Sequence, residues 1–257
     1  AAGNVVEFDI VAEALGKSES VTIADFGDTY AKRTIKDVTS ENATGVYYDP
    51  ESDELSFIPS TIADDVATLL STTNSIYAVA EFNKSFSDIN GHWSESYVEA
   101  MTNKLIIEGY ENGTFGPDRS ITRAEFAQLI VRALGLSAKT GTADFSDVSN
   151  GDWYADAVAI AADAGIVKGY EDGTFRPNQV INREELAAMV VRASAYAGKE
   201  LSVNASEQAS ILANFNDADD IVWAQEEIAA AVDAGIIEGY ETGAVGPRNT
   251  ATRAEAS

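Results

Sequence analysis

Apolar side chains recur at helical spacing in two long stretches and two shorter ones. In residues 126–134 they fall at i, i+3, i+4, i+7 and i+8, and residues 186–193 have the same period. Each stretch predicts an α-helix with one apolar face. Shorter apolar faces at 97–101 and 157–162 predict a further helix upstream of each long one. The pattern therefore indicates pairs of helices that bury their apolar faces together.

Residues 1–84 lack this helical period and are rich in β-branched and aromatic residues. Turn-forming pairs such as Asp49-Pro50 and Gly27-Asp28 separate the runs. We predict a small antiparallel β unit here, with 61–71 as an alternative short helix. The predicted strands lie in residues 5–11, 20–24, 45–48, 55–58 and 75–82.

The later part of the chain contains three copies of one pattern. Phe-Ser-Asp or Phe-Asn-Asp opens each copy, and a tryptophan follows within a few residues. Sixteen positions after each tryptophan comes Gly-Tyr-Glu, and an arginine stands fourteen positions after that glycine. Because the spacing from the tryptophan to the arginine is the same in every copy and the stretches between copies differ in length, the pattern predicts three equal structural units with variable linkers. The second linker, 199–213, contains apolar residues, so we expect it to pack against the rest of the protein.

Each copy has the signals of a helix, a turn and a second helix. Ser94 is placed to cap the first helix of copy one, and Asn112-Gly113 and Asp172-Gly173 are tight-turn pairs. The second helix begins with a capping box, in which a side-chain oxygen and a carboxylate three residues later satisfy free amides. The capping pairs are Thr122 with Glu125, Asn182 with Glu185, and Thr252 with Glu255. A unit of about 50 residues buries little surface alone, so we expect the second helices to pack together.

Composition excludes several classes of partner. The chain has 17 Lys and Arg against 42 Asp and Glu, a formal net charge of −25, with no basic cluster. Such a charge repels nucleic acid and anionic membrane surfaces, so we expect neither partner.

No stretch approaches the roughly 20 apolar residues of a membrane span, and the absence of cysteine excludes disulfides and thiolate metal sites. No initiating Met or signal peptide is present, so we expect Ala1 to be an internal cut.

As a set, three motifs resemble the S-layer homology repeat. They are the Phe-Ser-Asp…Trp opening, the Gly-Tyr-Glu-x-Gly-Thr-Phe-x-Pro turn and the Ile-Thr-Arg-Ala-Glu helix start, which together cover about two thirds of the chain. With the β unit, the resemblance implies an α+β chain whose C-terminal part is a pseudo-threefold, mostly α-helical module of three helix-turn-helix repeats. The expected parts are a β-rich domain at 1–84, repeat 1 at 85–140, repeat 2 with its linker at 141–212, and a truncated repeat 3 at 213–257.

The resemblance also implies a function. Such repeats anchor secreted surface proteins non-covalently to the wall of Gram-positive-type bacteria, by binding a pyruvylated secondary cell-wall polysaccharide in grooves between repeats. The implied location is extracellular, in the cell wall or surface layer. Carried over to this sequence, the polysaccharide-binding residues would be Arg123, Arg183, Arg253, Asp88, Asp147, Asp217, Trp93, Trp153 and Trp223.

Three departures affect this transfer. Copy two has Glu184 and Glu185 beside its arginine, which places an extra carboxylate there. Copy three has Gly243-Ala244-Val245 where the others have Gly-Thr-Phe, so we expect its turn to be reshaped. The sequence ends at Ser257, directly after the third capping box, so we expect the third repeat to lack its second helix.

The chemistry of the site would be binding without catalysis. A planar guanidinium grips a ketal-linked pyruvate carboxylate through two hydrogen bonds, and the positive end of a helix dipole favours the same anion. An indole would stack on the sugar, and an Asp would accept hydroxyl hydrogen bonds. Core packing explains the tryptophans equally well. The arginines favour function, because a first-turn Arg needs no structural partner.

Other chemistry is not supported by the residue pattern. His92, the lone histidine, is expected at the surface, because no second histidine or cysteine stands nearby to make a metal site. The Asp-rich turns do not match a complete calcium loop, and we expect no cofactor. Paired catalytic carboxylates in a recognisable context are absent, so we expect no enzyme in this chain.

Two other functions remain open. The repeats would serve mainly protein contacts if the chain is a self-associating subunit of a surface-layer lattice. Alternatively, the chain would be the anchor of a surface enzyme whose catalytic domain lies upstream.

Overall fold

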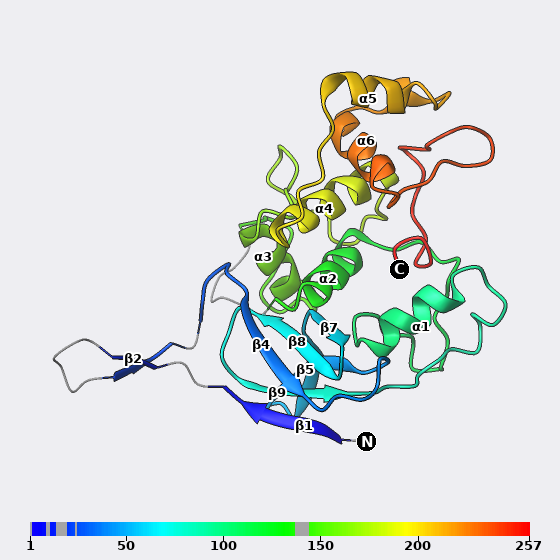
Figure 1. Cartoon of the computed structure of the whole chain (residues 1–257). Helices are drawn as coiled ribbons and strands as arrows, with labels where there is room; N and C mark the ends of the chain where they lie inside the picture. Colours follow the sequence, from blue (N-terminus) through cyan, green and yellow to red (C-terminus); the bar gives the residue numbers. More distant parts are fainter. Residues whose placement is uncertain (1, 9–10, 14–19, 24, 137–143) are drawn as a thin grey trace. The chain divides into compact units, whose positions relative to one another are not determined.

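The chain forms two compact units (Figure 1). The computed structural model describes residues 2–8, 11–13, 20–23, 25–136 and 144–257. The first unit comprises Ala1–Phe115 with Arg132–Ser137, and the second comprises Gly116–Val131 with Ala138–Ser257. The boundary between them runs through copy one, whose first helix belongs to the first unit and most of whose second helix belongs to the second.

The first unit contains antiparallel β-sheet, as predicted. A four-stranded sheet has the order β1-β9-β5-β6, a three-stranded sheet has the order β4-β8-β7, and β2 pairs with β3. Every one of these described strand pairs is antiparallel. The strands are β1 Ala2–Glu7, β2 Val11–Glu13, β3 Ser20–Thr22, β4 Ala31–Lys36, β5 Thr44–Asp49, β6 Glu54–Phe57, β7 Ser60–Ala63, β8 Val66–Ser71 and β9 Ile76–Ala80.

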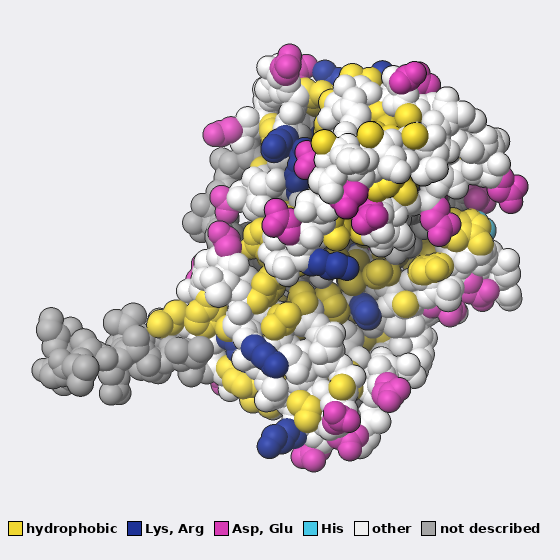
Figure 2. Space-filling model, turned by 45° about the horizontal axis from the view of Figure 1, so that its top comes forward, with side chains coloured by type: hydrophobic (Ala, Val, Ile, Leu, Met, Phe, Trp, Pro, Cys, Tyr) yellow, Lys and Arg dark blue, Asp and Glu magenta, His cyan; other side chains and the backbone are white. Residues whose placement is uncertain are grey.

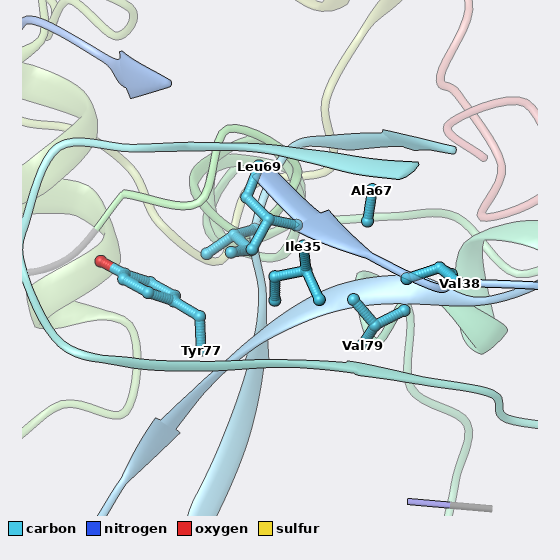
Figure 3. Packing of buried hydrophobic residues seen from close by; sticks show 7 residues of the cluster. Ile35, Val38, Ala67, Leu69, Tyr77 and Val79 are labelled. Atoms are coloured by element: carbon cyan, nitrogen blue, oxygen red, sulfur yellow. The ribbon is translucent and has the colours of Figure 1, made fainter. Parts of the chain in front are cut away.

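The core of this unit follows from the alternation of side chains along the strands. On β8 and β9 every second residue is buried, as expected for strands with one face turned to a core. Figure 3 shows Ile35, Leu69, Tyr77 and Val79 gathered between the strands that carry them. The two sheets therefore enclose one apolar cluster.

The predicted strands 45–48, 55–58 and 75–82 correspond to β5, β6 and β9. The predicted strand 5–11 falls on parts of β1 and β2, and 20–24 falls on β3; within these, residues 9–10 and 24 lie outside the described residues.

One expectation for the β unit is wrong, and one strand in a region without a prediction was missed. The alternative of a helix at 61–71 fails, because β7 and β8 form a hairpin joined by Asp64-Asp65, both at positive φ (52° and 58°). Two positive φ values in a two-residue loop match the twist of a hairpin. Strand β4 was not predicted, because Arg33 occupies one of its buried positions and breaks the apolar pattern. Its guanidinium donates to Thr73 O (2.8 Å) and lies over the Tyr77 ring.

Helices occupy the three copies at the predicted places. In each copy a first helix (α1, α3 or α6) precedes the Gly-Tyr-Glu turn, and α2 and α4 follow it in copies one and two. In copy three, residues 253–256 form a turn instead. The second linker forms α5, which packs on α6. The bounds are α1 Glu95–Asn103, α2 Arg123–Ala133, α3 Ala155–Asp163, α4 Arg183–Tyr196, α5 Ala205–Leu212 and α6 Gln225–Asp233, with a 3₁₀ turn at Ala218–Asp220.

Backbone hydrogen bonds join the three copies in a cycle within the second unit. The amide of Ile121 donates to Ala251 O (3.1 Å), that of Ala251 to Ile181 O (3.0 Å), and that of Ile181 to Ile121 O (3.0 Å). All three residues are buried and directly precede the capping boxes. Each copy therefore contacts both others directly before its capping box.

The capping boxes are confirmed, whereas the Ser94 cap is wrong. The Glu185 and Asn182 side chains bond each other's backbone amides, and the Thr122 and Thr252 boxes repeat these bonds. Ser94 stands at the start of α1 but makes no capping bond; its buried hydroxyl lies 2.8 Å from His92 Nδ1. Half-buried His92 thus contacts its own loop.

In each copy the ring of the opening phenylalanine packs directly against the glycine of Gly-Tyr-Glu. A Cβ at Gly169 would lie 2.4 Å from Phe145 Cε1, and the same clash arises between Gly109 and Phe86 (2.1 Å) and between Gly239 and Phe215 (2.5 Å). No side chain fits there unless the ring moves. The pairing explains why these two motif residues recur together.

The turn that follows is the same in all three copies. In copy three the Tyr240 amide donates to Ala244 O (2.8 Å), and Gly243 has φ +78°, beside +80° for Gly113 and +77° for Gly173. The expectation of a reshaped turn in copy three is therefore wrong. The turn therefore forms in copy three without the Thr-Phe side chains of the other copies.

We predict that Gly169→Ala destabilises the protein by about 1–3 kcal/mol, because the new methyl group overpacks against the Phe145 ring. Gly151→Ala is the matched control: a Cβ there meets nothing within 4 Å. Chemical denaturation of both variants measures the difference. Equal unfolding free energies for the two variants would contradict the packing argument.

The turn of copy two should show an acid titration. The hydroxyl of Thr174 first, and Arg176 next, donate to Asp172 and lower the pKa of its carboxyl from 3.8 to about 2. A lowered folded-state pKa stabilises the turn above the unfolded pKa, and this contribution is lost as pH falls from about 4 to about 2. We predict that carboxyl ¹³C NMR gives the low value and that Thr174→Val raises it toward 3.8. An unshifted Asp172 in the parent protein would refute this.

Candidate functional site

Arg123 lies in the first turn of α2 and is almost fully buried, with 5% of its surface exposed. Its Nε donates to Phe175 O (2.9 Å), and its Nη1 pairs with Glu185 Oε1 (2.8 Å). Its Nη2 is 3.5 Å from Lys168 O, a weak contact. The guanidinium of copy one is therefore embedded in copy two.

The other two arginines repeat this arrangement around the cycle. Arg183 donates from Nε to Val245 O (2.9 Å) and from Nη2 to Glu238 O (2.6 Å), and its Nη1 lies 3.5 Å from Glu255. Arg253 Nη1 lies 3.7 Å from Glu125 Oε1. Each arginine thus pairs with the capping-box Glu of another copy. The expectation that these arginines lack a structural partner is wrong, because their charges are compensated inside the protein.

Tyr170 of the copy-two turn lies between two guanidinium groups. The Cζ atoms of Arg123 and Arg176 are 4.8 and 3.8 Å from the centre of its ring. Its hydroxyl donates to Glu185, and burial first, then this bond, raise the pKa of Tyr170 above its usual value. Arg176 holds φ +58°, where copies one and three have Gly116 and Gly246.

The opening aspartates clamp the turns of their own copies. Asp147 accepts from the amides of Phe175 (2.7 Å) and Arg176 (2.8 Å). Asp217 accepts in the same way from Val245 and Gly246, both at 2.8 Å, and Asp88 accepts from Phe115 (2.8 Å). These bonds give the aspartates a structural role in addition to the ligand contacts predicted from the sequence.

The three tryptophans are exposed, which argues against core packing and leaves stacking on a sugar as the other alternative. Trp93, Trp153 and Trp223 expose 63%, 58% and 48% of their surface. Indoles of that exposure are not core residues, and their faces are accessible to a ligand.

A cavity of about 300 Å³ brings some of these residues together in the second unit. Its wall combines Arg123 of copy one, residues 167–171 and the α4 side chains Glu185, Met189 and Arg192 of copy two, and Trp223 of copy three. The volume is at the lower end for small-molecule sites. Of the nine residues predicted from the sequence, the structure places two, Arg123 and Trp223, in this wall.

The charges in the wall are unevenly compensated. Arg123 pairs with Glu185, and Arg192 lies 3.4 Å from Glu227. Lys168 is exposed and, within the part of the chain that the structure describes, forms no ion pair. Copies one and three carry Glu at the position of Lys168. Glu171 is also in the wall, is exposed and, among the described residues, forms no ion pair either. The wall therefore contains one lysine and one glutamate outside ion pairs, and the lysine is specific to copy two.

Sequence reasoning missed Tyr170, Lys168 and Arg192. A comparison of the copies gives a signal for Lys168, because Glu108 and Glu238 stand at the same place in the repeat. No pattern signalled Arg192, because its contribution depends on how α4 meets copy three.

Among the described residues, no cluster of His, Asp and Glu is arranged to hold a metal ion. No described helix is both long and apolar enough to cross a membrane.

Comparison with known proteins adds to this geometry. The S-layer homology domain matches residues 85–127, 144–187 and 214–257. The chain is 34% identical over 215 residues, 82% of its length, to an amylopullulanase of Thermoanaerobacterium thermosulfurigenes. It is 37% identical over 174 residues (67%) to exoglucanase XynX of Acetivibrio thermocellus. It is also 32% identical over 181 residues (70%) to an S-layer protein of Bacillus thuringiensis subsp. finitimus.

The chain spans 11%, 15% and 21% of the lengths of these three relatives. The enzyme names therefore describe proteins of which the matched part is a small fraction. The matched domain anchors proteins to the cell wall and is not catalytic. With three matched copies covering about half of its residues, the chain belongs to the S-layer homology domain family and is an extracellular protein of the bacterial cell wall and surface layer.

Proposed function

We propose that the chain anchors a surface protein by binding a pyruvylated secondary cell-wall polysaccharide in the cavity beside Arg123. The observation that carries the proposal is the presence, in one cavity wall, of an exposed indole, Trp223, and a lysine that forms no ion pair among the described residues, Lys168. An indole face suits a sugar ring, and a cation suits the pyruvate carboxylate. The three repeats would form a pseudo-threefold module of helix-turn-helix units, supported by the cyclic bonds at Ile121, Ile181 and Ala251.

The burial of Arg123 changes the role proposed for the arginines. Its charge is shared with Glu185, so it cannot be the sole counter-ion of a ligand. Its Nη2, held only by the 3.5 Å contact to Lys168 O, is the donor best placed to turn to a ligand carboxylate. Lys168 would supply the remaining charge. Arg183 and Arg253 would act in equivalent clefts of the other copies.

The aspartates and the other tryptophans stay in the proposal as secondary contacts. A carboxylate oxygen has a second lone pair, so Asp88, Asp147 and Asp217 would accept a sugar hydroxyl while clamping their turns. Trp93 and Trp153 would offer stacking faces in their own copies.

Contacts inside the cavity have to overcome the long-range repulsion between the acidic chain and the anionic polysaccharide. The chain carries a net charge of −25, and on the face shown in Figure 2 acidic side chains are spread widely, with basic ones single or in small groups. An anionic polymer is therefore repelled at a distance, and moderate salt screens that repulsion more than it weakens contacts inside a cavity. Binding should hold or strengthen as salt is raised.

The names of the relatives favour two settings for such an anchor. One relative is named an S-layer protein, so a second candidate function is self-association in a surface lattice. Others are named as polysaccharide-degrading enzymes, so the anchored protein could carry a catalytic domain. Assembly of the purified chain without polysaccharide would favour the lattice.

We predict that Trp223→Ala lowers the affinity of the chain for purified wall material about thirtyfold, the typical effect of losing a binding hot spot. Co-sedimentation at a series of wall concentrations measures this affinity. The indole is largely exposed, so the fold should survive. Ile236→Ala, which removes an exposed apolar side chain outside the cavity wall, is the control. Equal loss for both variants, or equal sedimentation of the unmodified chain with walls stripped of pyruvate, would refute the proposal.

We predict that Lys168→Glu weakens binding of a pyruvylated oligosaccharide about tenfold, because it reverses the charge facing the carboxylate. The variant installs the residue of the other two copies, so folding should be unaffected. Calorimetry with the same oligosaccharide lacking pyruvate provides the comparison. If the substitution costs as much with that ligand, Lys168 does not meet the carboxylate.

A further inference from the structure

Glu184, the second residue of α4, is a buried carboxylate that the binding proposal does not use. Only 2% of its surface is exposed. Copies one and three have Ala124 and Ala254 at this place, and both are equally buried. A carboxylate buried at a position where alanine suffices elsewhere has to be compensated, because its desolvation is costly.

The compensation comes entirely from copy three. Oε1 of Glu184 accepts three backbone N–H groups in succession, from Val222 (2.8 Å), Trp223 (2.7 Å) and Ala224 (3.1 Å). These amides lie directly before α6, so the negative charge also meets the positive end of that helix. Hydrogen bonds to an ionised acceptor are roughly twice as strong as neutral ones. Three such bonds to consecutive residues fix the backbone conformation of that segment.

The middle amide of the three belongs to Trp223, whose side chain is in the cavity wall. The bond therefore holds the backbone of a residue whose side chain leaves 48% of its surface exposed. The corresponding loop of copy two is closed by local bonds, from Asp152 N to Ser149 O (2.9 Å) and from Ala155 N to Asp152 O (3.0 Å).

We infer that Glu184 is a positioning residue that pre-orders the Trp223 indole in the cavity wall. The inference rests on the proposed function, because the purpose of the ordered indole is to receive a sugar ring. A platform that is already ordered spares the binding step the entropy of ordering it. Among the three indoles, the one held by a carboxylate from a neighbouring copy is Trp223.

The first experiment needs no ligand. In a Trp93→Phe, Trp153→Phe background, Trp223 is the only tryptophan, and time-resolved fluorescence anisotropy reports its motion. We expect Glu184→Ala to increase the amplitude of nanosecond motion about twofold, and Glu184→Gln to have a smaller effect, since its carbonyl oxygen still accepts. Glu207→Ala removes the capping carboxylate of α5, away from the cavity wall, and should leave the motion unchanged. Unchanged motion in Glu184→Ala overturns the inference.

The second experiment is a double-mutant cycle with purified pyruvylated polysaccharide. We expect Glu184→Ala to raise the Kd about tenfold when Trp223 is present and less than twofold when Trp223 is Ala, because the first residue acts through the second. A general loss of stability would lower binding equally in both backgrounds, and that result overturns the positioning role. If the unmodified chain does not bind the polysaccharide, the proposed function falls, while the anisotropy measurement still decides whether Glu184 orders Trp223.

Discussion

The arrangement of the repeats depends on a buried positive charge that no single copy can accommodate. A guanidinium removed from water needs acceptors for its N–H groups and a nearby negative charge. Arg123 obtains both from copy two, through Phe175 O and the capping-box Glu185. Glu185 in turn caps its own helix, so one carboxylate links a helix start to a neighbouring copy. Loss of either partner would leave the other buried and unpaired, at a typical cost of about 3–5 kcal/mol.

The residues shared by all three copies mostly serve folding. The glycine makes room for the opening phenylalanine, the aspartate clamps the turn, and the arginine joins neighbours. The residues that distinguish copy two have a different distribution. Lys168 and Glu184 replace Glu and Ala of the other copies, and both act on the cavity wall, one directly and one through Trp223. Under the proposed function, Lys168 and Glu184 would give the copy-two cavity binding properties that the shared motif alone does not supply.

Much of the fold could be predicted from the sequence, because its elements follow from local signals. The starts of the second helices were set by capping boxes such as Asn182 with Glu185, and the turns by glycine. Strand β4 was missed because Arg33 is buried against aromatic rings, a contact made by residues distant in the sequence. The site was predicted less well for the same reason. The embedding of Arg123 and the bonds of Glu184 join different copies, and no periodicity within one copy encodes them.

The cycle of amide bonds through Ile121, Ile181 and Ala251 has a consequence for the architecture of larger proteins. A stacked solenoid has two open ends and can grow by adding units. In the cycle, the amide and the carbonyl of each of the three residues are already paired with another copy. A fourth copy could therefore not join at these three residues, and extra repeats in a longer chain would have to pair elsewhere.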